Sequence, residues 1–280
     1  MTPKSILCPV SHAQADFQLD QVYRLCEAQG AHLTVLLIGI NPPMPMAIEA
    51  PSAEYWAEAI NKLRAQIDDR GRALEKQLHE RGLSADVRTV TCDASQVDQV
   101  VGQHGRFADL VVSPASLLDD DIVRAPSIAG SLFQAGRPLL LQSPLDPGKP
   151  LSLEANTVVV AWDGGLPVSR SLAFAIGLLQ AASAVHVVSI DPVMRDDADG
   201  EAPGWDLATY LSRHGIKVTV TNLPSGGQDI DAALLRHATE IGADLIVMGA
   251  YGHSKLRELI FGGTTRNMLA NSPVPLFMAH

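Results

Sequence analysis

The stretch ADLIVMGAYGHSKLRELIFGGTTRNML, from Ala243 to Leu269, decides the fold of this chain. Its apolar run Leu245–Met248 predicts a short buried strand, and the glycine turn GAYG (249–252) follows directly. A glycine pair at 262–263 then precedes a second helical pattern. A buried strand that turns on glycine into a helix is typical of a parallel α/β sheet.

The chain carries this strand and helix pattern twice, which predicts two tandem repeats. The strand ILCPVS (6–11) aligns with VVVAWD (158–163), and later strands align in the same order. The proline-rich segment SPLDPGKPLSL (143–153) joins the two copies and has the composition of a linker. We therefore expect one domain over residues 1–144 and a second domain over residues 154–280.

Short β-branched runs alternate with longer helical patterns in each copy. The strands predicted in the second copy are Val158–Ala161, Val185–Ile190, Lys217–Thr221, Leu245–Met248 and Val274–Met278. Nearly continuous apolar strands separated by helices indicate a parallel sheet that is covered on both faces. The expected fold class is α/β, with two tandem doubly wound (Rossmann-like) domains, each built on a five-stranded, mostly parallel sheet.

Composition excludes several classes of protein. The formal net charge of −10 argues against binding to nucleic acid or to an anionic membrane, because both usually need a basic face. No apolar run approaches the roughly 20 residues of a membrane span, so a soluble protein is expected. Cys8, Cys26 and Cys92 show no metal-like spacing and are expected to be the reduced, mostly buried cysteines of a cytoplasmic protein.

The glycine clusters of the second copy predict a phosphate site. The first cluster follows a strand at the edge where doubly wound sheets bind ligands, and glycine lets the backbone approach a ligand closely. The second cluster opens a helix, whose free amides attract phosphate and whose expected N-cap is one of two threonines. Glycines also serve tight turns alone, so this structural alternative stays open. The candidate residues are Gly249, Gly252, Gly262, Gly263, Thr264 and Thr265.

Asp163 is a further candidate for the same site. It ends the first strand of the second copy, which borders the switch point of a doubly wound sheet. A carboxylate there can accept a ribose hydroxyl or hold Mg²⁺ beside phosphates. An aspartate before Gly164 and Gly165 is also typical of a turn, and the residues alone do not separate the two interpretations.

These motifs resemble those of the universal stress proteins, whose ATP-binding members carry G-x2-G-x9-G-(S/T). Three glycines of the second copy fit that spacing, but Gly263 stands where the motif has serine or threonine. Losing one hydroxyl contact costs about 0.5–1.5 kcal/mol of binding. The resemblance implies ATP, ADP or AMP as ligand, with Mg²⁺ and the ribose near Asp163 and the adenine near Ser189 or Ile190. Met248, at the end of the strand, completes the implied site.

The first copy lacks every position of this motif. Pro114 and Leu117 replace the first two glycines, Pro126 removes an amide, and Ser11 stands where the second copy has Asp163. The acidic run LLDDD (117–121) repels a triphosphate. We expect the first copy to act as a structural, pseudo-dimer partner of the second.

Two classes of function follow from these observations. The first is a stress-response protein that binds an adenine nucleotide in its second domain. The second is a nucleotide-free interaction scaffold of the same fold. No GxSxG, HExxH or Walker sequence indicates a catalyst, although slow ATP hydrolysis stays open. The resemblance also implies pairing through the last strand, as in a homodimer of tandem chains. The stress, the pathway, the nucleotide and the oligomeric state are open.

Overall fold

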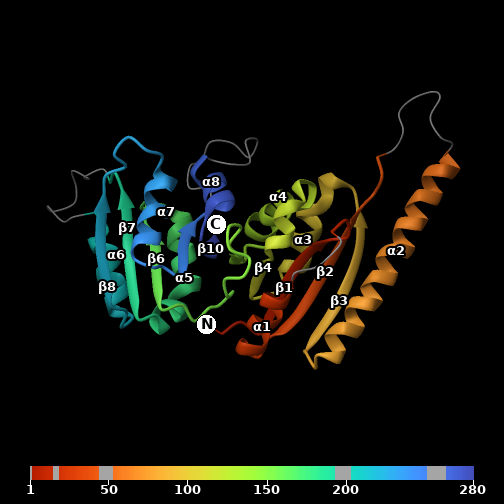
Figure 1. The fold of residues 1–280 in the computed structure, drawn as a ribbon, viewed down its shortest axis with the longest axis horizontal. Coiled ribbons are helices and arrows are strands. Elements are labelled where there is room, and N and C mark those ends of the chain that lie inside the picture. Colours follow the sequence, from red (N-terminus) through yellow and green to blue (C-terminus); the bar gives the residue numbers. More distant parts are fainter. Residues whose placement is uncertain (1, 15–18, 44–52, 193–202, 251–262) are drawn as a thin grey trace. The chain divides into compact units, whose positions relative to one another are not determined.

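The computed structural model describes residues 2–14, 19–43, 53–192, 203–250 and 263–280. The contacts between residues divide the chain into two compact units (Figure 1). The first unit is Pro3–Arg137, and the second consists of Met1–Thr2 and Pro138–His280. The division therefore falls before the proline-rich segment in which the sequence analysis placed it.

The first unit is a parallel sheet of four strands in the order β3-β2-β1-β4. Its strands are β1 (Ser5–Ser11), β2 (His32–Ile40), β3 (Ala85–Cys92) and β4 (Leu110–Ser113). Its α-helices are α1 (Asp20–Gln29), α2 (Ala53–Glu80), α3 (Val97–Gly105) and α4 (Asp121–Ala129). A 3₁₀ turn, Ala115–Asp119, joins β4 to α4.

The second unit contains six strands in the order β5-β10-β9-β6-β7-β8. They are β5 (Leu139–Leu141), β6 (Thr157–Ala161), β7 (Ala184–Ile190), β8 (Val218–Leu223), β9 (Leu245–Gly249) and β10 (Leu276–Ala279). The helices are α5 (Leu166–Ala181), α6 (Trp205–Arg213), α7 (Ile230–Glu240) and α8 (Gly263–Asn271). All pairs are parallel except β5 with β10, so the predicted α/β class with mostly parallel sheets is confirmed. The predicted five strands in each domain become four and six, because β5 pairs with β10 and belongs to the second unit.

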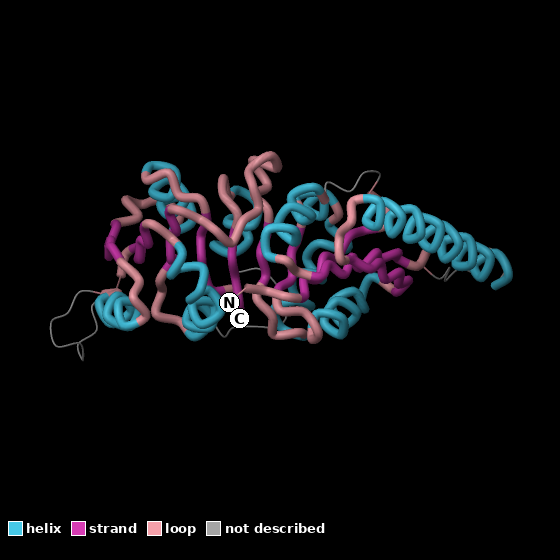
Figure 2. The backbone as a smooth tube through the Cα atoms, turned by 90° about the horizontal axis from the view of Figure 1, so that it is seen from below, coloured by secondary structure: helices cyan, strands magenta, loops and turns pink. Residues whose placement is uncertain are grey.

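Helices lie on both sides of the strands in each unit, as Figure 2 shows. This arrangement explains the apolar strands, because both faces of each sheet are covered. Residues Leu33 and Val35–Ile38 of β2, for example, have no exposed surface. Burying one such side chain stabilises the fold by about 1.5–3 kcal/mol. None of the helices in the described parts of the chain combines the length and apolar character that a membrane crossing needs.

Helix α2 is amphipathic and packs one face on its sheet. Ile67, Leu74 and Leu78 are buried on one face, at the spacing that an amphipathic helix requires. Gly71 lies on the same face, and a Cβ there would lie 2.5 Å from the Cγ2 of Thr89. Glycine therefore permits the close approach of α2 to β3.

The predicted linker, residues 143–153, forms no helix or strand but is anchored within the second unit. The hydroxyl of Ser143 donates to the carbonyl oxygen of Ser272 at 2.9 Å, and Lys149 Nζ donates to that of Ala243 at 3.2 Å. Leu151 is 3% exposed. This segment is therefore anchored to its own unit at Ser143, Lys149 and Leu151, while Leu145 between these points is 62% exposed.

Candidate functional site

The switch point of the second unit lies between β6 and β9, where the strand order reverses. Ala161 of β6 is in register with Met248 of β9 on one side and with Val188 of β7 on the other. The carboxyl ends of three neighbouring strands therefore meet. This register brings together the predicted site residues Asp163, Ser189 and Met248.

Ser189 is the clearest sign of a site at this edge. It is 4% exposed, and its hydroxyl has no hydrogen-bond partner in the structure of the described residues. A buried polar group without a hydrogen-bond partner destabilises the fold by about 1–3 kcal/mol, so its presence calls for an explanation such as ligand binding. Ile190, the other residue predicted to contact adenine, is half-buried at the last position of β7.

Asp163 is exposed in the turn that follows β6. Its Oδ1 accepts a hydrogen bond from the backbone amide of Gly165 at 2.8 Å, and Gly164 adopts a φ of 74°. Asp163 therefore takes part in a turn, which is one of the two roles that the sequence allowed for it. The contact uses one carboxylate oxygen and holds the side chain at the switch point.

The packing of β9 against α5 explains why residue 249 is a glycine. A Cβ at this position would lie 2.5 Å from the backbone nitrogen of Val168 and 3.0 Å from atoms of Pro167. Any side chain would thus collide with the first turn of α5. Close packing of β9 on α5 requires this glycine whether or not a ligand is bound.

The start of α8 differs from the sequence prediction in one respect. The helix begins at Gly263, so Thr264 and Thr265 lie within its first turn and neither is the N-cap. Thr265 is 7% exposed, whereas a Cβ on Gly263 would meet no atom of the described residues within 4 Å. Packing within the described part of the chain therefore does not explain Gly263. Gly252 and Gly262 fall outside the described residues.

Ser171 of α5 was missed by sequence reasoning. It has no exposed surface, its hydroxyl donates to the carbonyl oxygen of Met248 at 2.7 Å, and it accepts from the backbone amide of Ala279 at 2.7 Å. One side chain therefore links α5 to the carboxyl ends of β9 and β10. Its position among the apolar residues of a helical stripe could have indicated that this serine has a buried hydrogen-bonding role.

Asp191 is a second residue that the sequence analysis missed at this edge. It follows β7 and adopts a left-handed backbone conformation with φ 44°, which is uncommon for a residue other than glycine. Its Oδ1 accepts from the amide of Ser225 at 2.9 Å. Hydrogen bonds from the side chain and backbone of Ser225 lower the pKa of Asp191. The carboxylate thereby joins the loops that follow β7 and β8.

The corresponding edge of the first unit is built differently. The hydroxyl of Ser11, at the end of β1, donates to the carboxylate of Asp120. The other oxygen of that carboxylate accepts from the amides of Ile122 and Val123 at 3.0 and 3.1 Å, and so caps α4. A side chain of the protein therefore occupies the helix start where an anion could otherwise bind.

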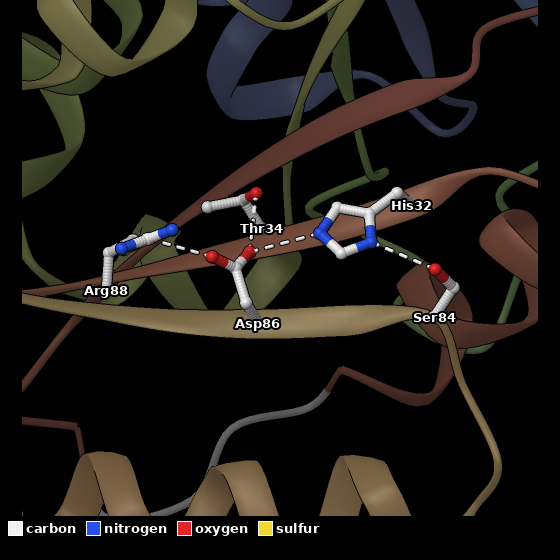
Figure 3. Close-up of polar contacts among 5 residues, drawn as sticks. All are labelled: His32, Thr34, Ser84, Asp86 and Arg88. Atoms are coloured by element: carbon white, nitrogen blue, oxygen red, sulfur yellow. Dashed lines mark hydrogen bonds and ion pairs between the residues drawn. The ribbon is translucent and has the colours of Figure 1, made fainter.

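A polar cluster joins β2 to β3 in the first unit (Figure 3). Asp86 Oδ1 accepts from the Thr34 hydroxyl at 2.8 Å and lies 3.2 Å from His32 Nε2, and Oδ2 lies 2.7 Å from Arg88 Nε. Burial by itself raises the pKa of Asp86, but the hydrogen bonds from Thr34 and His32 and the charge of Arg88 lower it below its usual range. The cluster lies near the amino ends of both strands, away from the ligand edge, so we assign it to strand pairing.

Comparisons with known proteins agree with this architecture. The model of the universal stress protein family matches residues 154–280. A universal stress protein of Synechocystis sp. is 29% identical over 120 residues, which cover 42% of this chain and only 40% of that protein. A stress response protein of Bacillus subtilis is 24% identical over 162 residues, covering 44% of this chain and 97% of that protein.

Solved structures resemble the whole chain in fold. A universal stress protein of Archaeoglobus fulgidus has a TM-score of 0.68 at 16% identity, covering 100% of this chain and 96% of that chain. A Pseudomonas aeruginosa protein of unknown function has a TM-score of 0.57 at 19% identity, covering 98% and 92%. The second copy of the repeat in this chain, residues 154–280, belongs to the universal stress protein family.

Proposed function

We propose that this chain is a cytoplasmic stress-response protein that binds ATP, or the related ADP or AMP, at the switch point of its second unit. The observation that carries the proposal is the convergence of three strand ends on a buried, unpartnered hydroxyl. Ser189 supplies that hydroxyl, and Asp163 and Met248 lie at the ends of the neighbouring strands. This is the edge at which doubly wound sheets take ligands.

The residues present fit an adenine nucleotide with Mg²⁺. Asp163 would hold the ribose or the metal, and the first turn of α8 would hold phosphates through its backbone amides. Among the described residues, no atom lies within 4 Å of a Cβ built on Gly263, so their packing does not require glycine there. Bound Mg²⁺ would neutralise phosphate charge. Ser189 and Ile190 would contact the base or sugar.

The first unit would act as a structural partner and not as a second phosphate site. The Asp120 carboxylate already satisfies the start of α4 and would repel a triphosphate. In addition, β10 is hydrogen bonded to β9 on one side and to β5 on the other. Pairing of β10 with a second chain would have to displace β5. Association of two tandem chains by another surface stays a prediction.

The decisive experiment introduces at the start of α8 a carboxylate like that of Asp120 at the start of α4. Gly263→Asp puts a carboxylate in the first turn of α8, where it favours the helix by about 0.3–1 kcal/mol but repels phosphate. We expect Mg-ATP at 100 times its Kd to stabilise the native chain by about 2.7 kcal/mol in thermal unfolding. The stability of Gly263→Asp should be the same with and without Mg-ATP. The matched control, Gly263→Ala, should keep the response.

The second candidate function is a nucleotide-free interaction protein. Two contacts favour it: Gly249 is required for packing on α5, and Asp163 closes a turn. Mass spectrometry of small molecules released by denaturing the pure protein separates the candidates. Release of no adenine nucleotide, together with no thermal response to Mg-ATP, would leave the interaction protein as the function.

A further inference from the structure

Buried polar atoms without partners gather at one edge of the first unit. Nine such side-chain atoms occur in the described residues, and six of them belong to residues at the carboxyl ends of β1, β2 and β4. These six are His12 Nδ1, Gln14 Nε2, Gln14 Oε1, Asn41 Oδ1, Ser113 Oγ and Ser116 Oγ. Native proteins leave few buried polar groups unpaired, so their concentration at the ligand edge of the sheet points to a binding site.

The three strand ends are adjacent and tied together. Strand β1 lies between β2 and β4, and the strand order reverses there. The amide of His12 donates to the carbonyl oxygen of Ile38 on β2 at 2.7 Å. Arg70 of α2 donates to the carbonyl oxygens of His12, at 2.5 Å, and of Gln14. The described start of this loop is thus held by its backbone, while His12 Nδ1 and both side-chain polar atoms of Gln14 have no partner.

The chemistry of this edge selects an uncharged ligand. Asp120 already fills the anion position at the start of α4, and the Arg70 guanidinium is bonded to backbone carbonyls. Burial, and then the charge of Arg70, lower the pKa of His12, so its imidazole is neutral near pH 7. Asn41 donates its amide to Asp93 at 3.0 Å and has its oxygen left as an acceptor. The Gln14 amide and the serine hydroxyls can both donate and accept.

We propose that the carboxyl edge of the first unit is a second binding site, separate from the nucleotide site. It takes an uncharged small molecule that offers both hydrogen-bond donors and acceptors, as a nucleoside, a free base or a sugar does. Gln14, Asn41, Ser113 and Ser116 bind it. Phosphorylated forms are excluded by Asp120.

A stability comparison in the ligand-free full chain tests this assignment. A hydroxyl or amide kept for a ligand is unpaired without it, so an apolar replacement removes a cost. Ser113→Ala and Gln14→Met should therefore each raise Tm by about 2 °C or more. The matched control is Ser131→Ala: this serine is equally buried, but its hydroxyl donates to the carbonyl oxygen of Ser127 at 2.8 Å. Tm should fall in the control.

Binding itself is followed with adenosine, adenine and D-ribose. Hydrogen exchange measured by mass spectrometry should show that at least one of them protects residues 5–14 and 110–117. That protection should weaken at least tenfold in Gln14→Met. Separate probes distinguish recognition of the base from recognition of the sugar. The proposal is overturned if Ser113→Ala lowers Tm as Ser131→Ala does, or if all three probes protect the second unit alone or nothing.

Discussion

The Ser11 hydroxyl donates to Asp120, and Asp120 caps α4 with its other carboxylate oxygen. At the aligned position in the second unit, the acid ends the strand as Asp163 and α8 begins at Gly263. In the first unit the acid lies at the helix start, and in the second unit it lies after β6. The acid at the start of α4 blocks anions there, whereas the described first turn of α8 contains no acid.

Asp120→Ala should destabilise the first unit. The change removes an N-cap worth about 0.5–2 kcal/mol and leaves the buried Ser11 hydroxyl without its acceptor. Urea unfolding of the full chain measures the loss. Asp121→Ala is the matched control, because Asp121 is exposed in the first turn of the same helix and contributes only through the helix dipole, by about 0.3–1 kcal/mol. Equal losses in both variants would contradict the capping role.

Ser171→Ala should destabilise the second unit by about 1–3 kcal/mol, since it leaves the Met248 carbonyl and the Ala279 amide buried without this partner. Chemical unfolding followed by circular dichroism provides the measurement. In the same helix, the exposed Ser169 bonds only to the carbonyl oxygen of Gly165, so Ser169→Ala should change the free energy by less than about 0.5 kcal/mol. A Ser171→Ala loss as small as that of Ser169→Ala would show that the linkage is dispensable.

The three free cysteines should be unreactive in the folded protein. Cys8, Cys26 and Cys92 are all buried, which confirms the sequence expectation. Burial raises the pKa of Cys26 to about 12 and raises that of Cys8 as well. Because the thiolate is the nucleophile, a disulfide reagent at pH 8 should label no thiol before urea is added and all three afterwards. Rapid labelling of the native chain would contradict the buried placement.

The second unit should lose stability as pH falls below about 6.5. Burial, and then His237 at a ring separation of 6.5 Å, lower the pKa of His186 from 6.5. The unfolded chain therefore binds the proton more readily, and stability declines as pH drops through this range. His186→Gln should flatten the difference in unfolding free energy between pH 7.5 and pH 5.5. The exposed His79→Gln control should keep the native difference, and an equal effect of both variants would refute the assignment.

Local sequence patterns were sufficient for the fold class, but not for the number of strands in each unit. The apolar runs predicted in the second copy are strands β6–β10, because side-chain burial sets the hydrophobic period of each element. Gly242 follows the C-cap of α7, Ile241, with a φ of 65°, the left-handed conformation in which glycine commonly ends a helix. The glycine spacing also identified the edge of the second sheet as the candidate site.

Tertiary structure decided which atoms meet across that edge. The sequence marked Gly249 but not its contact with Val168, and it contained Ser171 and Asp120 without indicating their partners. Periodicity reports only whether a side chain is buried. Hydrogen-bond partners depend on strand order and register between segments far apart in the chain, and those are fixed only when the sheet assembles.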